Sequence, residues 1–242
     1  MSRFLVPPGA IQGKRFELTG SEAHHAAHVL RKNAGDFIDL FDGKDHSFRG
    51  EITAISEDRI EGLIVEEKQV LEWPVSVILY QALAKGAKWD WLIEKNCEIG
   101  VSEIVPVLSQ RTIVKWSPAD AGKLERWNRI ALAASKQCGR SGLMPVRQPL
   151  LLDQALKEAV DRGAVLIPWE KELTRTISQA LSGNLPKTVS LFIGPEGGWD
   201  PSEIDRAHAV GALSVRLGPT LLRTETAGLV AAALVFREYG IY

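Results

Sequence analysis

Two segments of the sequence place glycine, proline and charged residues directly after short apolar runs. SLFIGPEGGW covers residues 190–199 and SVRLGPTLLRTETA covers residues 214–227, and each apolar run continues into a Gly-Pro pair. Glycine lets a ligand approach the backbone closely, and proline stiffens the loop while its carbonyl stays free to accept hydrogen bonds. Two such loops could clamp a flat heterocycle through main-chain groups. The alternative is a plain turn of the chain, and the three glycines of GPEGG argue against it.

Neither loop has the glycine pattern of a phosphate-binding loop. The GxGxxG pattern of dinucleotide-binding folds and the GxxxxGK[ST] pattern of nucleoside triphosphate sites are absent from both. A phosphate-gripping role is therefore not expected. The Gly-Pro pairs begin at residues 194 and 218 with one predicted helix between them, so we expect them on neighbouring strand ends.

Charged residues surround the predicted start of the last helix. Thr224 is a candidate to cap this helix, and Glu225 lies in its first turn, where the helix dipole favours a carboxylate. Glu225 therefore has a simple structural role open to it. Arg223 does not, because a cation at a helix N-terminus is disfavoured unless an anion or a carboxylate meets it.

A further polar pair lies at the end of a predicted helix over 121–138. Gln137 and Arg140 are three positions apart, so an amide and a guanidinium on one face could meet RNA or a substrate base. An ordinary explanation fits equally well: Gly139 ends the helix and Arg140 complements its negative terminus.

Histidines gather on a predicted helix that opens at Ser21 and runs to about residue 30. His24 and His28 are four positions apart, and Arg31 follows them. A metal site would need a third ligand or the glutamate of an HExxH motif, and neither accompanies them. We expect a surface for RNA phosphates or a packed helix, and no metal.

The elements that position these residues fall into two groups. The first seventy residues alternate short strands with turn residues, and one helix interrupts them, which predicts a small closed or half-closed β-barrel. Its strands are expected at 3–6, 15–18, 36–41, 47–55 and 59–66. The acidic stretch 66–73, followed by Pro74, is the predicted linker.

From residue 75 onward, apolar strands alternate with amphipathic helices. Strands are expected at 75–81, 103–108, 164–168, 189–193 and 213–217, and helices at 89–99, 121–138, 152–162, 176–181, 201–210 and 224–239. This alternation predicts an α/β fold with a parallel sheet covered on both faces. Ligands of such sheets bind outside the carboxyl ends of the strands, where both Gly-Pro loops are expected.

Composition excludes several classes of protein. The 242 residues carry a net charge of −1, with −4 on residues 1–72 and +3 on residues 73–242, so any RNA must bind through local patches. The apolar run 227–236 is too short for a membrane helix, and the first residues do not resemble a signal peptide, which predicts a cytoplasmic protein. Cys97 and Cys138 offer no disulfide framework and are expected to be buried thiols.

Five segments in the same order resemble one known family. They are HHAAHVLR (24–31), QALAKGAKWDWLIEKNCEIGVSEIVPV (81–107), SKQCGRSGLMPV (135–146), IGPEGGWDPSE (193–203) and LGPTLLRTETA (217–227). Together they resemble the ribosomal RNA small subunit methyltransferase E family, which belongs to the SPOUT class of S-adenosylmethionine enzymes. The chain departs from the family at Lys136, where an acidic residue is usual.

The resemblance implies a PUA-like RNA-binding barrel over 1–72 and a SPOUT methyltransferase domain over 73–242. The latter would be an α/β domain with a parallel sheet and a deep trefoil knot that holds S-adenosylmethionine. The resemblance also implies a homodimer that methylates N3 of a specific uridine in 16S RNA of the small ribosomal subunit. No metal is needed, since the sulfonium is already an activated leaving group.

Residue roles follow from the same resemblance. The cofactor-binding residues would be those of the two loops: Ile193, Gly194, Pro195, Glu196, Gly197, Gly198, Leu217, Gly218, Leu221, Leu222, Thr226 and Ala227. RNA would meet His24, His28, Arg31, Gln137 and Arg140. Arg223 would face the charge that develops on the uracil oxygens, and the N3 proton would go to Glu225, to water, or to solvent before binding.

Two alternatives stay open at this point. The same cofactor could serve another RNA target, such as a ribose 2′-hydroxyl or a transfer RNA base. The protein could also be a non-catalytic RNA-binding module, for instance an assembly factor, with purely structural glycine loops.

Overall fold

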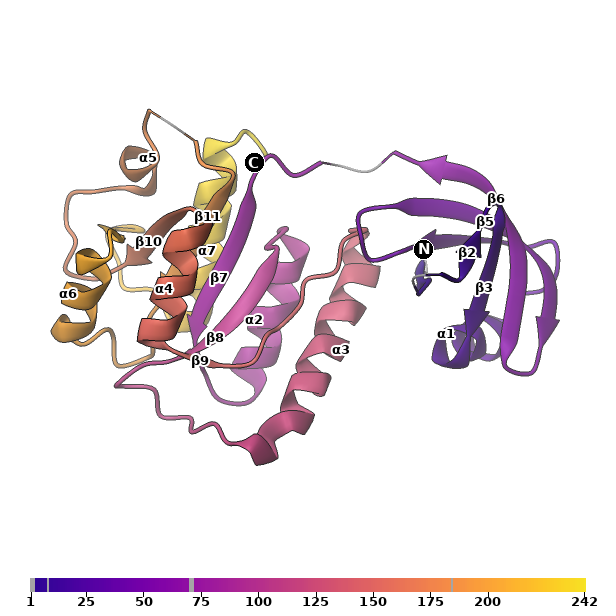
Figure 1. The fold of residues 1–242 in the computed structure, drawn as a ribbon, viewed down its shortest axis with the longest axis horizontal. Coiled ribbons are helices and arrows are strands. Elements are labelled where there is room, and N and C mark those ends of the chain that lie inside the picture. The colour runs from indigo at the N-terminus through magenta and orange to yellow at the C-terminus, as the bar shows by residue number, and fades with distance from the viewer. Residues whose placement is uncertain (1–2, 8, 70–71, 184) are drawn as a thin grey trace. The chain divides into compact units, whose positions relative to one another are not determined.

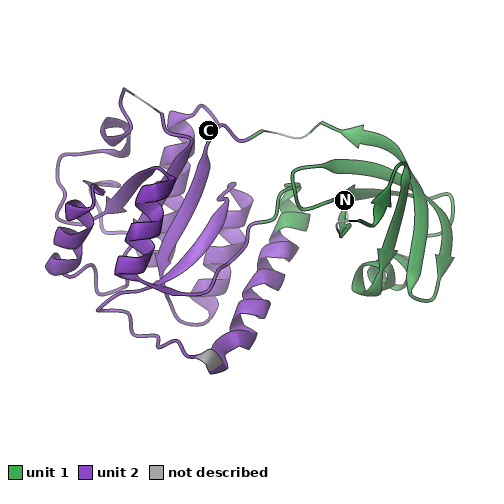
Figure 2. Ribbon diagram, in the orientation of Figure 1, with its two compact units in different colours: residues 1–72, 135–143 green, residues 73–134, 144–242 purple. Residues whose placement is uncertain are grey.

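The computed structural model describes residues 3–7, 9–69, 72–183 and 185–242 (Figure 1). The chain forms two compact units, coloured separately in Figure 2. Unit 1 comprises Met1–Glu72 and Ser135–Leu143, and unit 2 comprises Trp73–Ala134 and Met144–Tyr242. The ranges expected from sequence, 1–72 and 73–242, assign Ser135–Leu143 to the C-terminal domain, whereas in the structure this segment belongs to unit 1.

Unit 1 is built on one six-stranded sheet, in the order β1-β4-β5-β6-β3-β2. Its strands are β1 (Arg3–Leu5), β2 (Ile11–Gln12), β3 (Arg15–Thr19), β4 (Phe37–Phe41), β5 (Ser47–Ser56) and β6 (Arg59–Lys68). β1 pairs with β4 in parallel, and the other pairs are antiparallel. The two-residue β2 was not predicted, because it is too short to show an alternating pattern.

The predicted linker begins too early. Glu66 and Lys68 still belong to β6, where they pair with Arg49 and Ser47 of β5. Because the stretch is acidic and lacks an apolar alternation, its place in a ladder is not visible from the sequence. Residues 70–71 of the predicted linker lie outside the described residues.

The inner face of this sheet forms the core of unit 1. Phe16, Leu18, Leu40 and Ile52 are almost fully buried on it. The predicted helix covers it as α1 (Gly20–His24), which continues into a π-helical turn, η1 (His25–Val29). Ala23 and Ala26 face the core from these two turns, and their small side chains let the backbone lie close to the sheet.

Unit 2 contains a six-stranded parallel sheet in the order β12-β10-β11-β7-β8-β9. The strands are β7 (Ser76–Ala82), β8 (Glu103–Leu108), β9 (Leu150–Leu151), β10 (Ala164–Pro168), β11 (Thr188–Ile193) and β12 (Leu213–Val215). The prediction of a parallel α/β fold is confirmed. The two-residue β9 was missed for the same reason as β2.

Helices cover both faces of this sheet (Figure 1). One face packs against α2 (Ala87–Glu98), α3 (Ala121–Cys138), α5 (Ile177–Ala180) and α7 (Thr224–Glu238), and the other against α4 (Leu152–Arg162) and α6 (Pro201–Ala209). Successive residues of β7 show the pattern, since Val77 and Leu79 face the first core and Ile78 and Tyr80 face the second. Burial on both sides explains the unbroken apolar strands.

The strand order corrects one prediction. The ends of β11 and β12 are not neighbours, because β10 lies between them and pairs with both. One intervening helix is compatible with either arrangement, so the spacing along the chain does not decide it. The knot expected around these strands stays a prediction.

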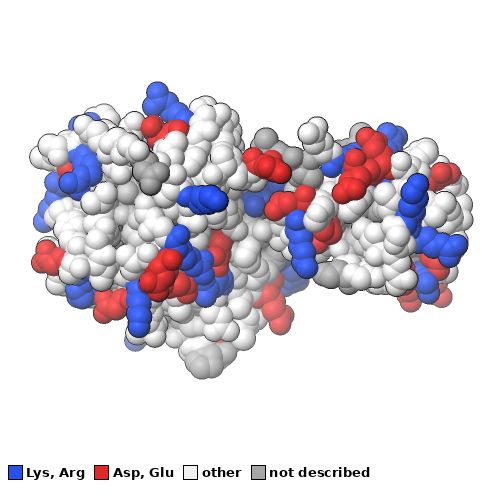
Figure 3. Space-filling model, turned by 45° about the horizontal axis from the view of Figure 1, so that its top comes forward, with Lys and Arg blue, Asp and Glu red and all other residues white. Residues whose placement is uncertain are grey.

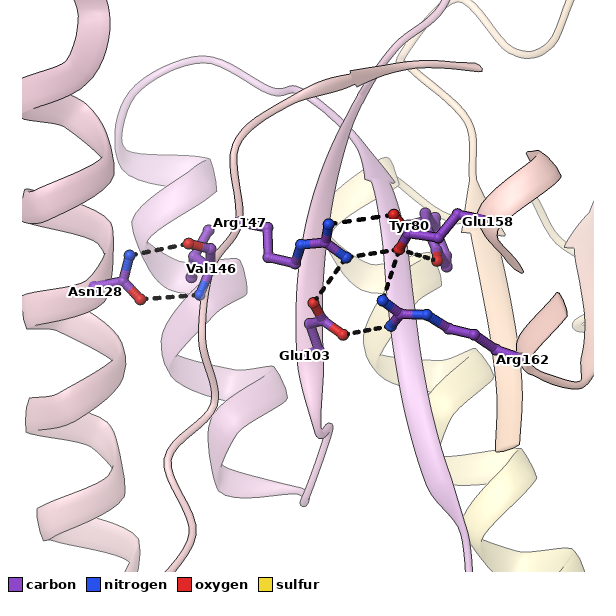
Figure 4. Close-up of polar contacts among 7 residues, drawn as sticks. All are labelled: Tyr80, Glu103, Asn128, Val146, Arg147, Glu158 and Arg162. Atoms are coloured by element: carbon purple, nitrogen blue, oxygen red, sulfur yellow. Dashed lines mark hydrogen bonds and ion pairs between the residues drawn. The ribbon is translucent and has the colours of Figure 1, made fainter. Parts of the chain in front are cut away.

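An ion-pair network joins β7, β8 and α4 on the second face (Figure 4). Arg147 and Arg162 each contact both Glu103 and Glu158, at 2.6–3.2 Å. The hydroxyl of Tyr80 donates to Glu158 at 3.1 Å, and burial together with that carboxylate raises the pKa of Tyr80. Two cations thus balance two carboxylates where α4 meets the sheet.

Two expectations about single residues have mixed outcomes. Cys97 is buried in α2, as predicted, whereas Cys138 is exposed because it lies in the last turn of α3 beside Gly139.

Among the described residues, no helix is long and apolar enough to cross a membrane. The same part of the chain holds no cluster of three or more His, Cys, Asp or Glu side chains arranged for a metal ion.

Candidate functional site

A cavity of about 1090 Å³ lies at the carboxyl ends of β10, β11 and β12. Ligand sites usually measure roughly 300–1,000 Å³, so this cavity has room for a nucleoside-sized ligand and a base beside it. Its walls are Lys88, residues 168–170, Glu172, Leu173, residues 193–199, residues 216–225 and Ala227. The two Gly-Pro loops therefore do meet at one site, although β10 separates their strands.

The loop after β11 makes a tight turn at its glycines. The amide of Gly198 donates to the carbonyl of Pro195 at 2.9 Å, and Gly198 adopts a φ of +69°, which favours glycine. A methyl group added to Gly194 would lie 3.1 Å from the indole nitrogen of Trp199, and one added to Gly197 would lie 3.6 Å from Arg111. Side chains at these two positions would meet protein rather than a ligand.

Gly218 in the second loop differs from them. A methyl group added there would have no atom of the described protein within 4 Å. Gly218 lines the cavity and has an ordinary φ, so its lack of a side chain leaves open space beside the cavity. Compared with Gly194 and Gly197, Gly218 best fits the expectation that a glycine lets a ligand approach the backbone closely.

Thr224 joins the two loops instead of capping α7. Arg223 is the N-cap residue, and neither it nor Thr224 makes a side-chain cap hydrogen bond. The Thr224 hydroxyl donates to the carbonyl of Gly194 at 2.6 Å and accepts from the buried amide of Gln81 at 2.8 Å. The predicted cap is therefore wrong, because these tertiary partners occupy the hydroxyl.

The segment after β10 forms the opposite wall. The side chain of Glu172 accepts hydrogen bonds from the amides of Thr174 and Arg175 and from the Thr174 hydroxyl. These bonds lower the pKa of Glu172 to about 2. Arg216, just after β12, donates to the carbonyls of Arg175 and Leu173 at 2.8 and 3.0 Å. The wall is thus tied to the start of the second loop.

Four charged side chains line the cavity near the start of α7. Lys88, in the first turn of α2, forms an ion pair with Glu196, and that carboxylate raises the pKa of Lys88. Arg223 is exposed at the start of α7 and Glu225 is half-buried in its first turn. The site therefore offers both a cation and a carboxylate to a bound ligand.

Three residues that line the cavity have a buried polar atom without a hydrogen-bond partner among the described residues. They are the indole nitrogens of Trp169 and Trp199 and one carboxylate oxygen of Glu225. An unpaired buried donor or acceptor costs about 1–3 kcal/mol, so such atoms are usually paired. The Trp199 nitrogen lies on the side of Gly194 that faces protein, so the Trp169 nitrogen and the Glu225 oxygen are the donor and the acceptor left for a ligand.

Sequence reasoning missed part of this site. Lys88, Trp169, Glu170, Glu172 and Leu173 line the cavity but were not singled out. The segment WEKE directly follows a predicted buried strand, so the strand-end rule alone would have drawn attention to it. Lys88 is a cation at a helix start, which is the same signal that singled out Arg223.

The candidate RNA-binding residues lie in unit 1. His24, His28 and Arg31 are exposed, and the two imidazole rings lie 4.6 Å apart. Gln137 is exposed as well. Arg140 is half-buried and its Nε donates to the carbonyl of Gly142 at 2.8 Å, in the loop that follows α3, so its contact with RNA stays a prediction.

Lys136, where the family usually has an acid, forms an ion pair with Glu22 of α1. A positive side chain is therefore matched to its surroundings in this chain. Over the face of the molecule in Figure 3, Lys and Arg are interspersed with Asp and Glu. RNA bound to this face would therefore meet local basic patches rather than one large basic surface.

Comparisons with known proteins cover both units. A family model described as an RNA methyltransferase domain matches residues 71–236, and one described as an RNA methyltransferase PUA domain matches residues 18–65. Ribosomal RNA small subunit methyltransferase E of Bacillus subtilis is 32% identical over 227 residues, covering 91% of this chain and 89% of that protein. The protein of the same name from Synechocystis is 33% identical over 96% of this chain and 76% of its own.

Solved structures agree with this assignment. Ribosomal RNA small subunit methyltransferase E from Neisseria gonorrhoeae, bound to S-adenosyl methionine, has a TM-score of 0.86 at 31% identity, covering 97% of this chain and 96% of that one. A putative methyltransferase from Legionella pneumophila, in complex with the cofactor SAM, has a TM-score of 0.85 at the same identity and coverage. The fold, the cavity and these matches together show that the chain belongs to the RNA methyltransferase family, in the group of ribosomal RNA small subunit methyltransferases E.

Proposed function

We propose that this protein transfers the methyl group of S-adenosylmethionine to N3 of a specific uridine in 16S RNA of the small ribosomal subunit. The observation that carries the proposal is the cavity between the two Gly-Pro loops, with Arg223 and Glu225 at its wall. The named relatives and the S-adenosylmethionine-bound structures support the choice of cofactor and RNA. We infer further that the protein acts as a cytoplasmic homodimer.

The residues of the cavity fit this cofactor. The open space over Gly218 leaves room for a flat adenine beside the backbone of the second loop. The unpaired indole donor of Trp169 and the unpaired oxygen of Glu225 match a ligand that carries both hydrogen-bond donors and acceptors. Backbone groups of 193–198 and 217–218, with Leu221, Leu222 and Ala227, would hold it, whereas Thr226, also expected from the resemblance, does not line the cavity.

Arg223 has the position and chemistry to assist the methylated base. S-adenosylmethionine supplies an activated methyl group when bound. As N3 of uracil loses its proton, negative charge spreads to O2 and O4. The Arg223 guanidinium presents a planar set of donors that could stabilise this charge, and its exposure at the start of α7 leaves it free to reach the base.

The N3 proton has three possible acceptors in this proposal. Glu225 lies two residues from Arg223, and its unpaired buried oxygen makes it the candidate base within the protein. A water molecule, or deprotonation in solvent before binding, would serve equally. Arginine itself cannot accept a proton at neutral pH, so it is excluded from this role.

Unit 1 would supply contacts to RNA outside the cavity. His24, His28 and Arg31 lie on one exposed helical segment and its C-terminal end, and their side chains can donate to phosphate oxygens. Gln137 would extend this surface. The interspersed charges favour a structured target that is recognised by shape.

The test is methylation of small subunits from cells that lack this gene, followed by mass spectrometry of the RNA. A methyl group on one uridine base of 16S RNA, with reverse transcription stopped there because N3 can no longer pair, would support the proposal. A methyl group on a ribose hydroxyl or on transfer RNA would establish the alternative target. Failure to bind S-adenosylmethionine in calorimetry would instead favour a non-catalytic RNA-binding protein.

A further inference from the structure

The turn that follows β8 holds the glycine loop from outside the cavity. Ser109 and Thr112 close this turn, since the amide of Thr112 donates to the carbonyl of Ser109 at 3.1 Å and the amide of Ser109 donates to the Thr112 hydroxyl at 3.0 Å. The two residues between them, Gln110 and Arg111, project to the segment after β11. Neither was singled out from the sequence.

Arg111 makes two contacts with that segment. Its Nη1 donates to the carbonyl of Gly197 at 3.0 Å, and its Nη2 contacts the Asp200 carboxylate at 3.0 Å. The side chain also lies beneath Gly197, because a methyl group added there would be 3.6 Å from its Cβ and 3.7 Å from its Cδ. One guanidinium therefore spans the glycine turn and the N-cap residue of α6.

Gln110 strengthens the same connection. Its backbone amide donates to a carboxylate oxygen of Glu203 at 2.9 Å, and its side-chain amide donates to the Ser202 hydroxyl at 3.2 Å. Glu203 is almost fully buried, and its other oxygen accepts from the amide of Asp200. The first turn of α6 is thus fixed to the end of β8, and the glycine loop is held between that turn and β11.

A glycine-rich loop needs such restraint to bind tightly. Gly197 and Gly198 have more backbone freedom than other residues, and ordering them on binding would cost affinity. A loop that is already fixed binds its ligand without that cost. Arg111 reaches the loop on the side where Gly197 faces protein, so it can fix the loop without occupying the cavity.

We propose that Arg111 is a positioning residue, which holds the carbonyl of Gly197 and the carboxylate of Asp200 and so fixes the glycine loop for cofactor binding. This proposal rests on the proposed function for the identity of the ligand. It assigns to the end of β8 a role in a site built at the ends of β10, β11 and β12.

The experiment compares Arg111→Ala, Arg111→Lys and the control Arg206→Ala in the full-length protein. Arg206 lies on α6 and forms an ion pair with Asp153. Its side chain is 41% exposed against 45% for Arg111, so Arg206→Ala removes the same charge at a similar exposure but makes no change at the glycine loop. We expect Arg111→Ala to weaken S-adenosylmethionine binding in calorimetry about tenfold or more, because it removes charge-assisted hydrogen bonds. Arg111→Lys should recover part of the affinity, and Arg206→Ala should bind like wild type.

Hydrogen exchange of the ligand-free proteins supplies a second readout. The amide of Gly198 bonds to Pro195 and not to Arg111, so its exchange reports opening of the loop. We expect it to exchange several-fold faster in Arg111→Ala and unchanged in Arg206→Ala, with similar melting temperatures. Binding within about twofold of wild type, or unchanged Gly198 exchange, would overturn the role of Arg111. A wild-type protein that binds no S-adenosylmethionine would instead overturn the proposed function, and the exchange result would still test the hold on the loop.

Discussion

The hydroxyl of Thr224 donates to the carbonyl of Gly194 across 2.6 Å and so joins the start of α7 to the end of β11. The same oxygen accepts from the side-chain amide of Gln81, which is fully buried at the end of β7. Three elements that are far apart in the sequence therefore meet at one oxygen atom. This atom sets the distance between the first glycine loop and the helix that carries Arg223.

Replacing Thr224 by valine should destabilise unit 2 by about 1–3 kcal/mol, because the change removes the hydrogen bond to the Gly194 carbonyl and leaves the buried Gln81 amide only its 3.4 Å bond to the Ala82 carbonyl. Thr224→Ser keeps the hydroxyl and serves as the matched control. Urea unfolding measures both variants. Equal midpoints for wild type, Thr224→Val and Thr224→Ser would show that the hydroxyl contributes nothing.

Gly218→Val should weaken binding of S-adenosylmethionine by at least about 2 kcal/mol, close to thirtyfold, while the fold stays intact. The reason is that a side chain at Gly218 projects into open space beside the cavity rather than into the protein. Gly122→Val is the control, since Gly122 also has free space and an ordinary φ but lies in α3. Calorimetry decides: unchanged affinity in a folded Gly218→Val protein would rule out a ligand at this loop.

The pattern of elements in unit 2 could be predicted because each signal is local. Apolar runs bounded by Gly, Pro and charged residues mark β8 and β10 to the residue, and α3 and α4 likewise. Strand order is not local. Whether β11 lies beside β12 depends on their pairing with β10. The sequence between Gly194 and Gly218 contains no signal that predicts this pairing.

The site shows the same division. The two Gly-Pro loops could be found because each follows its strand directly, whereas the contacts that fix them come from distant residues. Arg111 lies 86 positions before Gly197, and Gln81 lies 143 before Thr224. Thr224 satisfies the local rule for a helix cap, but these tertiary partners take its hydroxyl. Lys136 departs from the family pattern, and its partner, Glu22, lies 114 positions away in the sequence.

Glu158→Gln should lower stability at pH 7 and matter less in acid. Hydrogen bonds and ion pairs with Arg147, Tyr80 and Arg162 outweigh the effect of burial and lower the pKa of Glu158 below its ordinary value of 4.5. A carboxyl with a lowered folded-state pKa contributes stability above its unfolded pKa, and that contribution is lost as the pH falls through the folded value. We expect a loss of about 1–2 kcal/mol at pH 7, since the network is only partly buried.

The measurement for Glu158 is urea unfolding at pH 7 and again well below pH 4.5. The control is Asp153→Asn, because Asp153 is 70% exposed and its pair with Arg206 should contribute little. The gap between wild type and Glu158→Gln should close in acid. A gap that stays constant with pH would assign the effect to packing rather than to the charge.

Replacing the exposed His24, His28 and Arg31 of unit 1 should weaken RNA binding and leave the cofactor site untouched. The variant is His24→Gln, His28→Gln and Arg31→Asn together, where asparagine suits the φ of +53° at position 31. Deleting residues 1–72 is a poorer test, because Arg3 donates to the carbonyl of Arg140 and to the hydroxyl of Ser141, which would lose these partners. Loss of the charged Arg31 contact to phosphate should reduce the salt dependence of binding by about one unit of slope. If the KM for subunits and the salt dependence of RNA binding are both unchanged, these three residues do not contact the RNA.

Arg223 gives the sharpest test of the chemistry. It occupies the N-cap of α7, where a cation is disfavoured by the helix dipole, and it makes no cap hydrogen bond there. If its guanidinium stabilises charge on the uracil oxygens, Arg223→Ala should lower single-turnover methylation at saturating S-adenosylmethionine about 10² to 10³-fold, with little change in cofactor affinity. Arg223→Lys keeps the charge but loses the planar fork, and should recover only part of the rate. A rate for Arg223→Ala within about threefold of wild type would make the arginine structural, and Lys88, the other cation at the cavity wall near α7, would then be the donor to test.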